Sequence, residues 1–512
     1  MTKYAIIINE VKFGTVSQFS NKLFDTEKAA QSEIDNLVKE YVNALQKLRP
    51  QDKYKYEKIK RVLFETEFYH NEIFENGKLA FYIDILPFEI DEHSEVKNEF
   101  IKECKEFYAD PVNGSDDNDG SEGAPFLTLK KAHTVATNYI TSASGKAVIH
   151  LAEGRFDQST RIQLIAGESI IGAGADKTFI NETPNTSNTS SSTYAFQLVG
   201  ADSLLSSLCV TGFVGGIAKT IWVVDGVVEH CRSAYNTASA NSSNGRGIYI
   251  EGGTVQDCEF DHNTAPNMYA HGAGAWIGGG TMTRCDIHDN KGNDLRDCLG
   301  NGLYMNGGTV SRCRIFANGV DKKATTDSNG GVWIEKGTLH NSLVYGNFGG
   351  TATLGGGIHN KGGNVRYCTV YNNKAYGDTT GASGYTQTSG GNCRNTIIFG
   401  NFKPGAAVSG GTFKDNLLDA AVSGYADGNY VATEVGFADA ANADFHIVRA
   451  ASPAVGKAAP MSSYPTDFEG TTRDPEKPTI GAYEYESGSE AFGAEIRVTK
   501  LEWRTGDSPS VE

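Results

Sequence analysis

Two pairs of neighbouring aspartate and histidine residues are the groups in this sequence best suited to chemistry. They are Asp261-His262 and His288-Asp289, and they lie one sequence period apart. If two copies of a repeat stack, the aspartate of each pair meets the histidine of the other. Such a cluster could transfer protons or hold a metal ion. The competing interpretation is structural, because polar residues of these types are also common in turns.

A column of aromatic residues is the second feature that could bind a ligand. Its members stand between mostly aliphatic neighbours, as Tyr249 does between Ile248 and Ile250. Because successive side chains of a strand point to opposite faces, inward aliphatic residues place the aromatic ones outward. The column is then either an exposed stripe that binds a ligand or a surface covered by loops, by the N-terminal domain or by a second subunit. It consists of Tyr249, Trp276, Tyr304, Trp333 and His359.

The element that must position these residues is a repeat that begins with glycine. One copy reads GIYIEGGTVQDCEFDHN from position 247, and further copies begin at 274, 302, 331 and 357, which gives spacings of 27, 28, 29 and 26 residues. Such a period is typical of a solenoid whose units bury their apolar faces by stacking. Each unit holds two short alternating apolar runs, which are strand patterns, and lacks the leucine-rich signature of a horseshoe-shaped repeat. The sequence therefore predicts a parallel β-helix.

Two further columns predict how the core is filled. The first holds one small residue per coil, and the second holds asparagines about five residues further on. We expect free thiols in the first column, because side chains in register on parallel strands point the same way. We expect the asparagines to suit a left-handed turn and to bond one another through their amides. The first column is Cys209, Cys231, Cys258, Cys285, Cys313, Ser342 and Cys368, and the second is Asn236, Asn263, Asn290, Asn318, Asn347, Asn373 and Asn401.

Composition excludes several classes of partner. The net charge of −16 argues against a nucleic-acid partner, which requires a basic face. No apolar run approaches the length of a membrane span, so no transmembrane segment is expected. The apolar run at residues 5–8 is too short for the core of a signal peptide, and no cleavage site follows it.

Residues 1–106 differ in composition from the rest and are predicted to form a separate domain. They hold only two of the 59 glycines and many charged residues. The patterns predict strands over Tyr4–Asn9, Val62–His70, Glu72–Phe74 and Leu79–Leu86, and helices over Thr26–Leu48 and Asp91–Phe107. This indicates a small α+β domain, in which we find no chemical motif.

An acidic turn follows at the start of the second domain, which is expected over residues 107–486. Its carboxylates could hold Ca²⁺, and an ordinary turn rich in aspartate and asparagine is the alternative. The spacing is not that of an EF-hand, because Phe126 stands where the bidentate glutamate belongs. The acidic residues are Asp110, Asp116, Asp117, Asp119 and Glu122.

The stretch YADPVNGSDDNDGSEGAPFLTLKKA at residues 108–132 resembles the opening segment of bacterial β-helix proteins of the pectate-lyase-like superfamily. In that family a strand, an acidic turn and a capping helix close one end of the solenoid, which implies a capping helix over Thr128–Ile140. The motifs DFHI at 444–447 and IGAYE at 480–484 are similar to the closing segment, here 440–486, of bacterial choice-of-anchor surface proteins. The resemblance implies a right-handed parallel β-helix, with its repeats over about residues 204–401.

Pectate-lyase-like folds host lyases, hydrolases, esterases and binding proteins, so the fold does not decide the function. The Asn-Thr-Asp and Gly-His-Gly signatures of polygalacturonases are absent, and so is the Arg-x-Pro-x-x-Arg pattern of pectate lyases. Our leading hypothesis is a surface- or virion-exposed protein, like a tail spike or an adhesin, that binds a polysaccharide or surface glycan on the aromatic stripe. The alternatives are a polysaccharide-degrading enzyme, a lyase rather than a hydrolase, and a structural stalk.

Assembly and location follow from the same hypothesis. Tail spikes with this fold are usually trimers, so we expect a homotrimer or a virion partner held through the N-terminal domain or through the tail at residues 487–512. Because no N-terminal signal is found, the protein is expected to reach the virion or the cell exterior by another route, or to stay in the cytoplasm.

Overall fold

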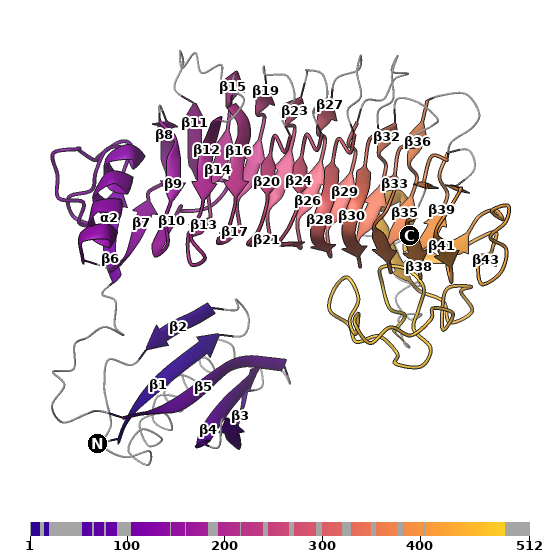
Figure 1. Ribbon diagram of the computed structural model, residues 1–512, viewed down its shortest axis with the longest axis horizontal. Coiled ribbons are helices and arrows are strands. Elements are labelled where there is room, and N and C mark those ends of the chain that lie inside the picture. The colour runs from indigo at the N-terminus through magenta and orange to yellow at the C-terminus, as the bar shows by residue number, and fades with distance from the viewer. Residues whose placement is uncertain are drawn as a thin grey trace, which may run out of the picture. The chain divides into compact units, whose positions relative to one another are not determined.

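The computed structural model describes the strands of the N-terminal region and most of residues 104–486 (Figure 1). The chain divides into two compact units, Met1–Glu103 and Cys104–Glu512. The helix expected over Thr26–Leu48 and the tail at 487–512 lie outside the described residues. The described ranges are 2–10, 15–19, 54–63, 66–75, 78–89 and 104–486, without 144, 159, 183–192, 216, 239–243, 266–270, 293–298, 320–328, 350–354, 377–381, 389 and 403–404.

The N-terminal unit contains a five-stranded antiparallel sheet in the order β2-β1-β5-β4-β3. The strands expected over Tyr4–Asn9, Glu72–Phe74 and Leu79–Leu86 are confirmed. The single strand expected over Val62–His70 is wrong, because β3 ends at Leu63 and β4 begins at Thr66 as its antiparallel partner. The strands are β1 (Thr2–Glu10), β2 (Thr15–Phe19), β3 (Tyr54–Leu63), β4 (Thr66–Glu75) and β5 (Lys78–Glu89).

The second unit begins with strand β6 and is closed at this end by helix α2 (Leu129–Ala143). The predicted capping helix is thus confirmed, and the side chain of Thr128 accepts a hydrogen bond from the backbone N–H of Lys131 at 3.1 Å, as an N-cap does. The helix expected up to Phe107 is wrong at its end, because Cys104–Ala109 is a strand paired with β7. No helix in the described ranges is both long and apolar enough to cross a membrane.

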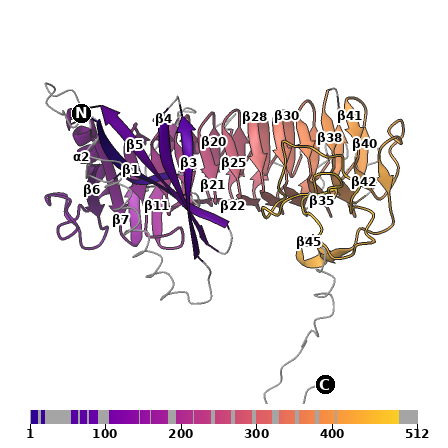
Figure 2. The ribbon, with the colours of Figure 1, turned by 90° about the horizontal axis from the view of Figure 1, so that it is seen from below.

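Two long sheets form the body of this unit, and all their strand pairs are parallel (Figures 1 and 2). Sheet A, with 20 strands, holds β6 (Cys104–Ala109), β7 (Lys146–Leu151), β9 (Ile162–Leu164), β10 (Glu168–Ile171), β12 (Thr193–Leu198), β13 (Leu204–Ser206), β16 (Ile217–Val223), β17 (Val227–Glu229), β20 (Ile248–Ile250), β21 (Thr254–Gln256), β24 (Ala275–Ile277), β25 (Thr281–Thr283), β28 (Leu303–Ser311), β30 (Val332–His340), β33 (Ile358–Asn360), β34 (Asn364–Arg366), β37 (Tyr385–Gln387), β38 (Asn392–Arg394), β40 (Ala406–Val408) and β41 (Thr412–Lys414). Sheet B, with 12 strands, holds β8 (Gly154–Gln158), β11 (Thr178–Glu182), β14 (Cys209–Thr211), β18 (Arg232–Ala234), β22 (Glu259–Asp261), β26 (Asp286–His288), β29 (Arg314–Phe316), β31 (Leu343–Tyr345), β35 (Thr369–Tyr371), β39 (Ile397–Phe399), β42 (Leu417–Leu418) and β43 (Tyr430–Val431).

Short strands complete the coils, so that one coil runs through β20, β21, β22 and β23 before the chain returns beside β20 as β24. The parallel β-helix that the sequence predicts is therefore confirmed. The short parallel strands are β15 (Val214–Gly215), β19 (Thr237–Ala238), β23 (Thr264–Ala265), β27 (Lys291–Gly292), β32 (Phe348–Gly349) and β36 (Lys374–Ala375). An antiparallel pair, β44 (Phe437–Asp439) and β45 (Asp444–Ile447), flanks a 3₁₀ turn at Ala440–Asn442.

Cysteines line the inside of the coils, as expected. Cys258, Cys285 and Cys313 are buried and free, and every described cysteine is a thiol. The predicted cysteine column is wrong at Cys209, by one position. Cys209 pairs in register with Arg232, so Leu208, and not Cys209, stands beneath Cys231. The coil before Cys231 is shorter than the others, and spacing alone therefore misplaced its residue.

The asparagine column forms a continuous ladder of buried amides, which confirms the predicted contact between coils. Asn263 donates from Nδ2 to Oδ1 of Asn290 at 3.1 Å, and Asn290 donates in the same way to Asn318 at 3.0 Å. The same bond runs from Asn236 to Asn401 through every intervening member. Each amide also donates to a backbone carbonyl of the preceding coil, so its polar atoms are satisfied inside the core.

The left-handed residue of this corner stands one position before the asparagine, which corrects the expectation that the asparagines take that conformation. His262 has φ 52° and Asp289 has φ 53°, whereas Asn263 and Asn290 are not among the residues with positive φ. Asn, Asp and His tolerate this region better than most residues. The ladder therefore fixes where each coil turns, and the residue before it points away from the core.

A closing segment from about residue 432 to residue 486 packs on the last strands of sheet B (Figures 1 and 2). Phe445 and Tyr483 of this segment are buried in a cluster with Leu343 of β31. Arg473 donates to the side chain of Asn341 at 3.0 Å and to Glu484 at 3.3 Å, and both ends of that ion pair are buried. The bond from Arg473 to Asn341 joins the closing segment to the β-helix.

We predict that Asn290→Ala lowers the free energy of unfolding by about 3 kcal/mol, because buried groups of Asn263 and Asn318 lose their partners at about 1–3 kcal/mol each. Urea unfolding followed by circular dichroism measures the change. Asn138→Ala on the exposed face of α2 is the matched control and is expected to leave the midpoint within experimental error. Equal effects of the two substitutions would show that the ladder adds no stability.

We predict that His340 makes the docking of the closing segment sensitive to acid. Burial, with Arg312 and Arg473 nearby, lowers the pKa of His340 to about 4, and its ring lies 4.8 Å from that of Tyr464. Since an unfolded histidine has a pKa of about 6.5, the unfolded chain binds the extra proton first, and stability falls as the pH drops from about 6.5 to about 4. Urea midpoints across this range should fall less in His340→Phe than in the wild type.

The control for His340 is His446, whose pKa is shifted in the opposite direction. Burial alone would lower the pKa of His446, but Asp444 and Glu469 raise it above its ordinary value. His446→Phe should therefore be less stable than the wild type below pH 6.5. Above the pKa of His446 in the folded protein this difference should disappear. If His340→Phe kept the full acid sensitivity of the wild type, His340 would not be its source.

Candidate functional site

The four predicted residues lie together on sheet B, but each histidine bonds through Nδ1 to the aspartate of its own pair rather than to that of the other pair. Strands β22 and β26 pair so that Asp261 lies directly beside His288. Both side chains occupy the last position of a three-residue strand, and His262 and Asp289 follow at the left-handed corner. The structure therefore brings Asp261, His262 and His288 together, and it joins Asp289 to them through His288.

Asp261 is the centre of this cluster. Its side chain has no exposed surface, and it accepts hydrogen bonds from Arg232 Nε at 2.8 Å and Arg232 Nη2 at 2.6 Å. His262 Nδ1 lies 2.6 Å from Asp261 Oδ2. Burial alone would raise the pKa of Asp261, but the bonds from Arg232 and His262 outweigh it and lower the pKa below its usual value. Asp261 is therefore an ionised carboxylate that holds its two neighbours in place.

His262 has the geometry of a general base. Because ionised Asp261 can only accept, Nδ1 carries the proton and the lone pair of the neutral ring is on Nε2. The side chain is 40% exposed, and its ring stacks on Tyr235 at 4.7 Å between centroids. A buried aspartate that orients a partly exposed histidine can activate a hydroxyl or remove a proton from a bound substrate.

His288 lies between two carboxylates. Its Nδ1 is 2.8 Å from Asp289 Oδ2, and its Nε2 is 3.0 Å from Glu259 Oε1. Burial alone would lower the pKa of His288, but the bonds to Asp289 and Glu259 and the charge of Asp261 raise it. Its ring also stacks on Phe316 at 4.6 Å. His288 is thus held more firmly than His262.

Arg232 and Glu259 belong to this site and were missed by sequence reasoning. They stand at the start of β18 and β22, in one column with Asp286 and Arg314. Aligning the repeats on their cysteines places Arg232, Glu259, Asp286 and Arg314 in one column, so this part of the signal was present in the sequence. Arg232 lies in a coil without the glycine motif, and its contact with Asp261 depends on the strand register.

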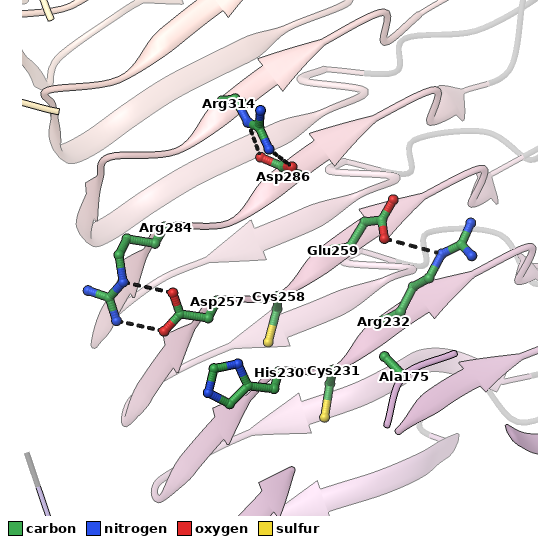
Figure 3. Close-up of a pocket in the computed structure, with 10 residues that line it drawn as sticks. All are labelled: Ala175, His230, Cys231, Arg232, Asp257, Cys258, Glu259, Arg284, Asp286 and Arg314. Carbon is green, nitrogen blue, oxygen red and sulfur yellow. Dashed lines mark hydrogen bonds and ion pairs between the residues drawn. The ribbon is translucent and has the colours of Figure 1, made fainter. Parts of the chain in front are cut away.

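A shallow depression of about 270 Å³ lies beside this cluster (Figure 3). Figure 3 shows three arginines in it, each paired with a carboxylate: Arg232 with Glu259, Arg284 with Asp257, and Arg314 with Asp286. Arg284 meets Asp257 through two nitrogens at 2.7 Å. Each arginine in the depression is therefore neutralised by a carboxylate. The depression lies at the corner where the coils pass from sheet A to sheet B.

The aromatic column lies in register on sheet A. Tyr249 pairs with Trp276, and Tyr304 pairs with Trp333 on the following coils. Trp222 on β16 is a further member beside Tyr249, which sequence reasoning missed because its coil lacks the glycine motif. Ile248 and Ile250 are fully buried and Tyr249 is half-buried, so the predicted alternation is confirmed.

The rings of the column stack on one another in part. Tyr249 and Trp276 are parallel, with centroids 4.1 Å apart and planes 5° apart. Tyr304 stacks instead on His271 at 4.8 Å. In the described part of the chain, no second ring stacks on Trp276, so the face of its indole away from Tyr249 is not covered by another aromatic side chain.

The end of the column is buried, which limits the predicted exposed stripe. Trp333 is 7% exposed and His359 is 4% exposed, and their rings stack at 4.0 Å. Trp333 also donates from Nε1 to Glu335 at 2.9 Å. The expectation of an open stripe therefore fails at these two residues and leaves Trp222, Tyr249, Trp276 and Tyr304 as its partly exposed members.

The acidic turn uses its carboxylates locally. Asp110 accepts from the backbone of Val112 at 2.8 Å, and Asp119 accepts from the backbone of Ser121 at 2.9 Å. Asp116 accepts from the backbone and the hydroxyl of Thr128, and so ties the turn to α2. Among the described residues, the groups that bring three metal-ligating side chains together do not include Asp110, Asp116, Asp117 or Asp119. The Ca²⁺ site remains a prediction.

Comparison with known proteins finds similarity in structure only. No protein-family model and no curated protein sequence matches this chain. Pectate lyase Pel9A is 15% identical, with a TM-score of 0.47 over 75% of this chain and 96% of that one. The A-modules of the Azotobacter vinelandii mannuronan C-5 epimerases AlgE6 and AlgE4 are 13% and 12% identical, with TM-scores of 0.34 and 0.29 over 59% and 63% of this chain and 93% and 100% of theirs.

At these values the likeness concerns the fold alone and carries nothing about ligand or activity. The expected resemblance to pectate-lyase-like proteins holds at that level. The parallel β-helix itself rests on the strand pairings of this chain.

We predict that Asp261→Asn lowers the free energy of unfolding by about 2–3 kcal/mol, because Arg232 loses two charge-assisted bonds to a buried carboxylate. The matched control is Asp286→Asn on the next strand, whose partner Arg314 is 52% exposed. We expect less than about 1 kcal/mol there, as for other exposed ion pairs. Urea unfolding measures the change in both variants. An equal decrease in the free energy of unfolding would contradict the central role of Asp261.

Proposed function

We propose that this β-helix binds a polysaccharide along the partly exposed aromatic column of sheet A. The observation that carries the proposal is that Trp222, Tyr249, Trp276 and Tyr304 stand in register on consecutive rigid strands. Rungs of a sheet are about 4.8 Å apart, so the rings form a row along the solenoid. Sugar rings present C–H faces that pack well on aromatic side chains. A strip of this kind suits an extended chain of sugars.

Polar groups flank the strip and could bond sugar hydroxyls. Glu251 is exposed and accepts from Trp222 Nε1 at 3.0 Å. Lys219 lies 3.8 Å from the ring centroid of Trp222 and 4.1 Å from that of Tyr249. Carbohydrate sites combine apolar faces with a small number of placed polar groups, and this surface offers both.

A polysaccharide-degrading enzyme is the second candidate, and the Asp261–His262 pair favours it. A buried, ionised Asp261 orients a histidine whose other nitrogen can take a proton. However, the pair and the arginines near it lie on sheet B, while the aromatic column lies on sheet A. A groove that combined arginines and carboxylates with the column would have favoured the enzyme, so binding remains the first proposal.

Location and assembly remain proposals as well. A place on a virion or a cell surface would put the strip in contact with a glycan. A homotrimer that covered the strip would instead favour the structural stalk, and the measurement below separates these cases.

The proposal predicts that the chain is retarded during electrophoresis through gels cast with acidic or neutral polysaccharides. Trp222→Ala together with Trp276→Ala should weaken binding at least tenfold, because burying an aromatic side chain contributes about 1.5–3 kcal/mol and tenfold corresponds to about 1.4 kcal/mol. Retardation as a function of polysaccharide concentration gives the dissociation constant.

Phe402→Ala is the matched control, because Phe402 is 55% exposed and lies outside the column. It should leave retardation unchanged. Clearing of the gel that His262→Ala abolishes would support the enzyme. No retardation and no clearing on any gel would overturn both proposals and leave the stalk.

A further inference from the structure

Three metal-ligating side chains converge on sheet B, outside the proposed glycan surface. They are Glu259, Asp261 and His288 from the adjacent strands β22 and β26, and one ligand atom of each lies within 4.8 Å of the others. All three lie within strands of sheet B. Their spacing is therefore set by strand register rather than by loop conformation.

A proton or a metal ion must lie between the ring of His288 and Glu259. With Nδ1–H donated to Asp289 at 2.8 Å, neutral His288 has its lone pair on Nε2. That nitrogen faces Glu259 Oε1 at 3.0 Å, and a carboxylate oxygen can only accept. Two acceptors at this separation repel unless a proton or a metal ion lies between them.

The separation also suits a metal ion. Nitrogen and oxygen ligands lie at about 2.0–2.2 Å from an ion such as Zn²⁺, which places two of them about 3.4 Å apart in a tetrahedral site and about 3.0 Å apart in an octahedral one. Asp289 behind His288 completes the carboxylate–histidine–metal arrangement that fixes the ring and raises its basicity. This is the orientation that a metal-binding histidine needs.

Asp261 keeps a free site for the same ion. Its Oδ1 accepts one bond, from Arg232 Nε at 2.8 Å, whereas its Oδ2 is shared by Arg232 and His262. An ionised carboxylate has about four lone-pair positions, so Oδ1 retains one for coordination. Arg232 therefore holds Asp261 from one side and leaves the side toward His288 open to a ligand bond.

The local charge favours a divalent cation. Glu259, Asp261 and Asp289 bring three negative charges to the cluster, and Arg232 brings one positive charge. The neighbouring Asp286 is neutralised by Arg314. The three carboxylates and Arg232 leave an excess of two negative charges, which one divalent ion in place of the proton between His288 and Glu259 would balance.

We propose that Glu259, Asp261 and His288 form a binding site for a divalent first-row transition-metal ion. One imidazole with two carboxylates suits Zn²⁺, Co²⁺ or Mn²⁺, whereas Ca²⁺ requires six to eight oxygen ligands. Three protein ligands leave at least one coordination position for water or a substrate atom. The site is independent of the proposed glycan surface, which lies on sheet A.

The test is titration of the chelator-treated full chain with Co²⁺, followed by its visible d–d absorption, with Zn²⁺ added to displace it. We expect one equivalent of Co²⁺ to saturate the signal and Ca²⁺ to leave it unchanged. His288→Gln and, separately, Glu259→Gln should each weaken Co²⁺ binding at least about tenfold. Because Glu259 is 43% exposed, its substitution should leave the fold intact, and circular dichroism checks this.

The matched control is His446→Gln, which removes a histidine that also lies between two carboxylates, Asp444 at 2.6 Å and Glu469 at 3.4 Å. It should leave Co²⁺ affinity unchanged. Absence of binding would mean that a proton fills the position beside Glu259, and would overturn the proposal. Equal Co²⁺ affinity of the wild type, His288→Gln and Glu259→Gln would place the metal elsewhere and would overturn it as well.

Discussion

The structure depends on one interaction, the hydrogen-bonded ladder of buried asparagines. A polar amide inside an apolar core is tolerated only when all its donors and acceptors are paired. Asn263 meets this condition only if Asn290 lies directly above it, at 3.1 Å, and Asn290 only if Asn318 does so at 3.0 Å. Any slip in register would leave amides unpaired. The ladder therefore sets the alignment of every coil it joins.

Alignment of the coils turns repeats in sequence into columns in space, and both candidate surfaces are such columns. On sheet B, the corner before the ladder places His262 and Asp289 in left-handed positions, next to the strand residues Asp261 and His288. On sheet A, the same register places Tyr249 beside Trp276. The residues that carry each proposal therefore owe their positions to an interaction in which they take no part.

The two surfaces differ in the contacts that their side chains make with one another, which are ion pairs on sheet B and ring stacking on sheet A. On and beside sheet B, Arg232, Arg284 and Arg314 each pair with a carboxylate, and an excess of negative charge remains around His288. On sheet A the rings cover one another by stacking. Trp333 and His359 stack and are buried, whereas Trp276, among the described residues, stacks on Tyr249 alone and stays partly exposed. An excess of negative charge attracts a cation, whereas a ring face that no other ring covers attracts an apolar surface. The chemistry of the two proposals follows from this difference.

The sequence by itself determined the coil, since period, glycine starts and apolar alternation predicted the parallel β-helix. The asparagine column predicted the contacts between coils, and the resemblance of residues 108–132 to β-helix opening segments implied the capping helix. The sequence also placed Asp261, His262, His288 and Asp289 together. Only the tertiary structure added Arg232 and Trp222, because their coil lacks the glycine motif on which the repeats were aligned. Only the tertiary structure buried Trp333 and His359 and shifted the left-handed residue to the position before each asparagine. Exposure and backbone torsion depend on packing in three dimensions, and a pattern of residue types along one chain does not contain them.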